Sequence, residues 1–86
     1  MIACIWDYYG PDSKGTAEHF EKHLNEFIKQ KNIKIIQTGT TSKFSQAFVW
    51  CVGQKIELED LIYLLKPKHF LKENEFTAFE IFLTPT

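Results

Sequence analysis

The chain has 86 residues, which is enough for one small domain and too few for two, so residues 1–86 are expected to form a single domain. Hydrophobic residues make up 44%, charged residues 24% and the formal charge is −1, which excludes a disordered chain and a strongly charged surface. No apolar run reaches the roughly 20 residues of a membrane span, and the apolar start lacks the basic segment of a signal peptide. We therefore expect a cytoplasmic protein with no membrane partner.

The first strand is predicted over residues 2–9, where β-branched and aromatic residues continue until Gly10-Pro11 makes a turn. From Thr16 the apolar residues are spaced three and four apart, which predicts a helix over about 16–31. Thr16 is expected to cap this helix, and Asn32 is expected to end it.

Two strands are predicted next, over residues 33–38 and 44–52. Gly39 and the polar residues 40–43 are expected to form the hairpin loop between them, and Gly53 is expected to end the third strand.

A second helix is predicted from the apolar spacing of residues 58–65, and Pro67 is expected to end it. Residues 68–75 are expected to be a connection and 76–83 a last strand, with 84–86 as a short tail. The order strand, helix, strand, strand, helix, strand predicts an α+β, ferredoxin-like βαββαβ fold, a four-stranded antiparallel sheet with both helices on one face.

Both faces of the predicted sheet are apolar, although two helices can cover only one of them. In strand one, one face carries Ile2, Cys4 and Trp6, and the other face carries Ala3 and Ile5. Strands three and four also have apolar residues on both faces. Because a bare aromatic face is unfavourable in a monomer, we expect a homodimer packed through the sheet. The alternative is that the loop at 66–75 folds back over this face.

Asp7 is the only charge in the first strand, and an unpaired buried carboxylate is costly. One interpretation is that Asp7 lies at the rim of the sheet and binds a divalent cation. The other is that it accepts hydrogen bonds from the loop 10–16.

Several stretches resemble the family of CRISPR-associated small endonuclease-like proteins and the related virulence-associated protein D ribonucleases. These stretches are Ile5-Trp6-Asp7, Ile35-Ile36-Gln37-Thr38, Phe48-Val49-Trp50 and the turn Glu73-Asn74-Glu75 before Phe76. The resemblance implies a ferredoxin-like dimer that acts on nucleic acid. It also implies that Asp7 from each subunit is the catalytic residue and holds a metal ion, Mg²⁺ or Mn²⁺, over a phosphodiester.

His19 and His23 are a second candidate site, since they lie four residues apart on one face of the first helix. This spacing can hold Zn²⁺, Ni²⁺ or Cu²⁺, with a third ligand from elsewhere, such as His69. The alternative is a solvated flank of the helix.

The loop from Gly10 to Gly15 has the glycine spacing of a phosphate-binding loop but lacks the lysine that follows the second glycine. Its amides at a helix N-terminus are left with a weaker role in anion binding. Cys4 and Cys51 lie in apolar runs and are expected to be buried, reduced thiols.

Three functions remain open from the sequence. The first is a homodimeric, metal-dependent nuclease-like protein that uses Asp7. The second is a non-catalytic, dimeric binding or regulatory module; the neutral charge and the absence of Arg favour it. The third is a small-molecule enzyme with an aromatic pocket among Trp6, Phe48 and Trp50, with His19 or His23 as the base.

Overall fold

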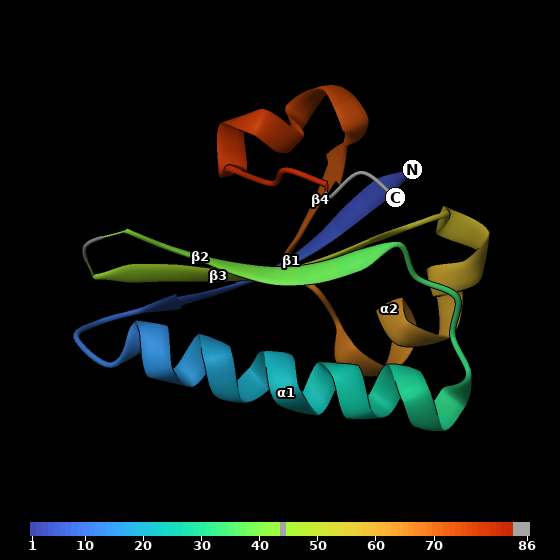
Figure 1. The fold of residues 1–86 in the computed structure, drawn as a ribbon, viewed down its shortest axis with the longest axis horizontal. Coiled ribbons are helices and arrows are strands. Elements are labelled where there is room, and N and C mark those ends of the chain that lie inside the picture. Colours follow the sequence, from blue (N-terminus) through green and yellow to red (C-terminus); the bar gives the residue numbers. More distant parts are fainter. Residues whose placement is uncertain (44, 84–86) are drawn as a thin grey trace.

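A four-stranded antiparallel sheet organises the part of the chain that the computed structural model describes, residues 1–43 and 45–83 (Figure 1). Its strand order is β2-β3-β1-β4, so β1 pairs with both β3 and β4. The strands are β1 Ile2–Tyr9, β2 Gln37–Lys43, β3 Gln46–Gly53 and β4 His69–Lys72. The α+β class and the antiparallel sheet predicted from the sequence are therefore confirmed.

The helices lie on both sides of this sheet. The α-helices α1 (Ser13–Lys31) and α2 (Glu59–Leu65) lie on one side, and the 3₁₀ helix η1 (Lys55–Leu58) leads into α2 (Figure 1). A second 3₁₀ helix, η2 (Glu73–Phe79), lies on the opposite side. Within residues 1–43 and 45–83, no helix is both long enough and apolar enough to cross a membrane.

The alternating residues of β1 and β3 form two separate cores, as the sequence pattern predicts. Cys4 and Trp6 of β1 pack with α1, η1 and α2, and Ala47, Val49 and Cys51 of β3 join them. The intervening residues, Ala3 and Ile5 of β1 with Trp50 and Val52 of β3, pack on the opposite face. Phe44, placed on that face by the sequence pattern, lies outside the described residues.

The second face is covered by the chain itself, which removes the reason for expecting a dimer through the sheet. We call residues 73–83 the C-terminal cover, and its residues Phe76 and Ile81 are buried against Ile5 and Trp50. The ring of Phe79 meets that of Phe48 edge to face at 5.3 Å. The expectation of a bare sheet face is wrong, and the covering segment lies further along the chain than the 66–75 loop considered as an alternative.

The last strand is also placed differently from the prediction. β4 spans His69–Lys72 and pairs with β1, whereas residues 73–79 form η2 instead of the strand expected over 76–83. The apolar residues of this segment have a different role, because they pack on the sheet face and do not extend the sheet. The tail 84–86 lies outside the described residues.

β2 begins four residues later than predicted and includes the expected hairpin loop. Ile33 and Ile35 pack against the helix-side core, while the polar residues from Gln37 to Lys43 pair with β3 at the sheet edge. Gly39 is therefore a packing residue and not a turn residue. A Cβ atom there would overlap the ring of Trp50.

α1 begins at Ser13, three residues before the predicted start, so Thr16 lies within it and does not cap it. Asn32 ends this helix in a left-handed conformation (φ 55°), as expected. α2 ends at Leu65 and Lys66 takes the left-handed cap, just before Pro67.

Cys4 and Cys51 face each other across β1 and β3 as buried free thiols, which confirms the sequence expectation. Burial raises the pKa of each thiol to about 12, and the neighbouring Cys4 adds to the effect on Cys51. Neither thiol is therefore suited to act as a nucleophile at neutral pH.

Candidate functional site

Asp7 lies where β1 extends beyond the end of β4, on the same sheet face as Ala3 and Ile5. β4 pairs with β1 only as far as Ile5, which lies opposite His69. Residues two apart on a strand share a face, so the Asp7 side chain is a diagonal neighbour of His69. The strand register thus brings together two residues that are 62 positions apart.

The Asp7 carboxylate is buried, with 6% of its side chain exposed, and its two oxygens have different partners. Oδ2 accepts a hydrogen bond from the Tyr9 hydroxyl at 3.0 Å and lies 3.2 Å from Nε2 of His69. Oδ1 is buried without a hydrogen-bond partner, and the Lys68 ammonium lies 3.8 Å from it. We call Asp7, Tyr9, Lys68 and His69 the Asp7 cluster.

The cluster keeps the carboxylate ionised. Burial by itself raises the pKa of Asp7, but the hydrogen bonds from Tyr9 and His69 and the positive charges of His69 and Lys68 lower it more, so the pKa lies below its usual value. The same bond to Asp7 raises the pKa of the Tyr9 hydroxyl, so Tyr9 remains a donor. The partners of Asp7 are therefore these three side chains.

The residues around Asp7 do not fit a Mg²⁺ or Mn²⁺ ion held by this chain alone. Such ions take several oxygen ligands, whereas two of the neighbours of Asp7 are the cationic or proton-donating side chains Lys68 and His69. Over residues 1–43 and 45–83, no group of three His, Cys, Asp or Glu side chains is arranged to hold a metal ion.

His19 and His23, which we call the histidine pair, lie close together on the exposed face of α1. Their Nε2 atoms are 3.0 Å apart and their rings meet edge to face, as the four-residue spacing predicts. Nδ1 of His23 lies 3.9 Å from a carboxylate oxygen of Glu26. His69, considered as a third ligand, lies on the opposite side of the sheet in the Asp7 cluster.

Two other features that the sequence suggested are not assembled as sites. The glycine loop is only a short turn, because α1 begins at Ser13 and includes Gly15. Trp6 lies in the helix-side core, whereas Phe48 and Trp50 lie on the covered face, so the three rings do not line one pocket.

The sequence alone singled out Asp7 but missed Tyr9, Lys68 and His69 as its partners. The contact between Tyr9 and Asp7 can be predicted from the sequence, because residues two apart on a strand lie on one face. The contacts of Lys68 and His69 with Asp7 cannot, because they depend on β4 and that segment was expected to be a connection.

Comparison with known proteins adds no family assignment, since no family model, curated protein or solved structure matches this chain.

Proposed function

We propose that this protein is a ferredoxin-like domain that binds single-stranded RNA and cleaves it at the Asp7 cluster without a metal ion. The observation that carries the proposal is the pair formed by the buried Asp7 carboxylate and the half-exposed His69 ring, 3.2 Å apart. A carboxylate that fixes one nitrogen of an imidazole leaves the other nitrogen for acid–base chemistry. The ferredoxin-like assignment is supported by the order βαββαβ, which η2 then extends.

The proposed reaction is an internal transesterification of RNA. With the proton of His69 Nε2 directed to Asp7, Nδ1 accepts the proton of a ribose 2′-hydroxyl. The 2′-oxygen then forms a bond to the neighbouring phosphorus, and the bond from phosphorus to the 5′-oxygen breaks. The 5′-oxygen takes a proton from solvent, which leaves a 2′,3′-cyclic phosphate and a 5′-hydroxyl.

The surface beside the pair suits a nucleic-acid strand. Tyr9 is largely exposed, so its ring offers a platform on which a base can stack. The Lys68 side chain is also exposed, and its ammonium can contact a phosphate. We expect recognition of a short strand to depend on this local cation and aromatic ring, because the whole chain carries a formal charge of −1.

The test is cleavage of a labelled single-stranded RNA in EDTA, with a 2′-O-methyl RNA of the same sequence as the matched substrate. We expect cleavage of the first only, with cyclic phosphate ends. We expect His69→Gln to lose about 10²–10⁴-fold in rate, the usual contribution of a general base. Asp7→Asn should also lose activity, while His19→Gln, an exposed histidine outside the cluster, should not.

The same assay with Mg²⁺ or Mn²⁺ separates this mechanism from the metal-dependent nuclease that the family resemblance implies. Cleavage that needs the metal and Asp7 but not His69 would refute the acid–base mechanism. If the parent protein cuts no RNA in either condition, the nuclease proposal fails and the non-catalytic binding module is left.

The homodimer stays a prediction. Its original reason, an uncovered sheet face, no longer holds. Light scattering tests it directly: a mass near 10.1 kDa would refute it.

RNA binding by the His69→Gln variant, measured by fluorescence anisotropy, tests recognition separately from catalysis. Adding Tyr9→Leu to the His69→Gln variant should weaken its RNA binding roughly fivefold or more, as expected when one stacked base is lost.

A further inference from the structure

A cavity of about 430 Å³ opens at the edge strand β4, where the helices leave this strand uncovered. Most of its lining comes from the helix side of the sheet, and Leu71 and Glu75 complete it from the side of the C-terminal cover. Phe70 and Lys72 of β4 face the helix side, since they pair with Cys4 and Ile2 of β1. Phe70 stays 51% exposed, because α1 packs over β1, β2 and β3 and the short α2 does not extend over β4. The cavity is thus a gap in the helix layer, and its volume is that of a small-molecule site.

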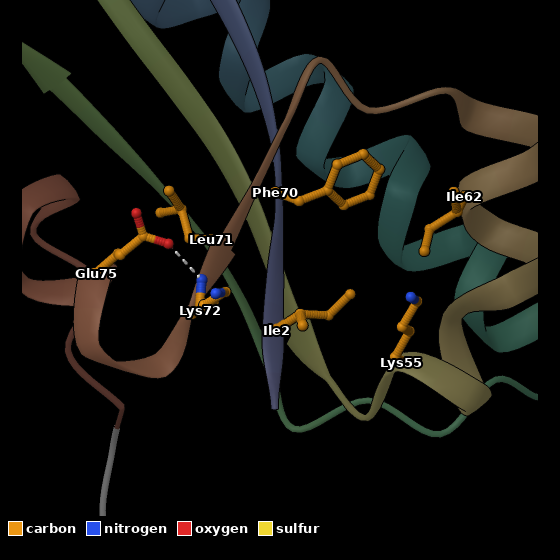
Figure 2. Close-up of a pocket in the computed structure, with 7 residues that line it drawn as sticks. All are labelled: Ile2, Lys55, Ile62, Phe70, Leu71, Lys72 and Glu75. Carbon is orange, nitrogen blue, oxygen red and sulfur yellow. Dashed lines mark hydrogen bonds between the residues drawn. The ribbon is translucent and has the colours of Figure 1, made fainter.

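The lining is apolar in its body and charged at its margin. Ile2, Ile62 and Phe70 come from β1, α2 and β4 and turn toward one space (Figure 2). Lys55 at the start of η1 and Lys72 at the end of β4 bring two ammonium groups to this lining.

The third charged group of the lining, Glu75, is already engaged. One of its carboxylate oxygens accepts a hydrogen bond from the backbone N–H of Lys72 at 2.8 Å (Figure 2). Among the ion pairs of the described residues, none involves Lys55, Lys72 or Glu75. Two lysines and one glutamate leave the lining with one formal positive charge.

We propose that this cavity binds a small amphipathic carboxylate, a molecule with one aliphatic chain and one negative charge. The chain would cover Phe70, Ile62 and Ile2, which are otherwise in contact with water, and the carboxylate would pair with Lys55. Burial of the apolar surface provides most of the affinity, while the single positive charge selects an anion.

This site is separate from the Asp7 cluster. β4 alternates its side chains, so His69 and Leu71 face the C-terminal cover while Phe70 and Lys72 face the helix side. The carboxylate site therefore does not depend on the RNA-cleaving function proposed above.

The probe is sodium decanoate, titrated into the full chain and followed by NMR of the isoleucine methyl groups. We expect saturable shifts at Ile2 and Ile62 and none at Ile28, which is buried on α1. Decylammonium, which has the same chain and the opposite charge, should bind about two- to fivefold more weakly, the range expected for one exposed ion pair.

Two variants test the residues. Lys55→Met should weaken decanoate binding about two- to fivefold, while Lys14→Met, which changes an exposed lysine on α1, should leave it unchanged. Ile62→Trp fills the cavity and should abolish the shift at Ile2. Equal binding of decanoate and decylammonium, or shifts spread over both faces of the sheet, would overturn the proposal. So would a dimer, seen by light scattering, that protects Phe70 without any ligand.

Discussion

Truncation of Phe76 to alanine tests whether the C-terminal cover packs on the sheet in solution. Phe76 is 5% exposed and lies against Ile5, Trp50 and Leu71. A phenylalanine buries roughly 150–250 Å², which at about 25 cal/mol per Å² corresponds to about 4–6 kcal/mol. Because the unfolded chain already buries part of that surface, we expect a loss of about 3–5 kcal/mol in the free energy of unfolding.

This loss is a large part of the roughly 5–10 kcal/mol expected for a chain of this size. It should lower Tm by more than about 12 °C and shift the urea midpoint to a much lower concentration.

The matched control is Phe82→Ala, which removes the same side chain from the same segment. Phe82 is 65% exposed, so the free energy of unfolding should change by less than about 0.5 kcal/mol. Equal effects of the two substitutions would refute the packing of the cover. The apolar sheet face would then need another partner, and the dimer through the sheet would again be the best explanation.

Three further predictions follow from the packing and the charges. Gly39→Ala places a Cβ against the Trp50 ring and should lower the free energy of unfolding by about 1–3 kcal/mol. Gly15→Ala has free space in a helix and should raise the free energy of unfolding by about 0.5–1 kcal/mol. Urea unfolding measures both changes. The pKa of Asp7 is lowered in the folded protein, so its contribution to stability is present above the usual value of 3.8 and is lost as the pH falls through the lower folded value. The difference in stability between the parent and Asp7→Asn should therefore shrink below pH 3.8, and a constant difference would contradict the assignment. The histidine pair should bind Ni²⁺ or Zn²⁺, so the metal should raise Tm for the parent and not for variants with either histidine replaced by glutamine.

The sequence predicts the central strands and α1 well because each has a strong local signal. In β1 and β3, apolar residues on both faces correctly indicate two packed surfaces. In α1 the three-and-four spacing predicts the buried stripe, and Asn32 marks its end.

The edge strands are different, because a strand at the edge is defined by pairing and not by its own hydrophobicity. β2 consists of polar residues that resemble a loop, while the more apolar residues 33–36 lie before it. At β4, only Leu71 is buried among its four residues, so the pattern carries little signal. The following segment, residues 76–83, is more apolar than β4, and this pattern predicts a strand. In the structure the segment packs on the face of the sheet instead.

The candidate site likewise combines a feature with a local sequence signal and a feature that depends on long-range pairing. An isolated carboxylate in an apolar strand is visible in the sequence, because its burial requires partners. Which partners it has depends on where β4 meets β1, and this long-range register has no local signature.

The register of β4 determines both proposed sites, and contacts just beyond the β1–β4 pairing support it at each end. At one end the N–H of Lys68 donates to the carbonyl of Ile5 at 2.8 Å, and at the other end the N-terminal ammonium of Met1 donates to a carboxylate oxygen of Glu73 at 3.4 Å. A shift by one residue would turn His69 to the helix side and Phe70 toward Asp7, since alternate residues face opposite ways. The carboxylate of Asp7 would then lie beside a ring that cannot donate a hydrogen bond. Asp7 would keep the hydrogen bond from Tyr9 but lose its contact with His69. The cost of removing a partner from a buried carboxylate favours the observed register, so the Asp7 cluster also helps to position the strand that lines the cavity.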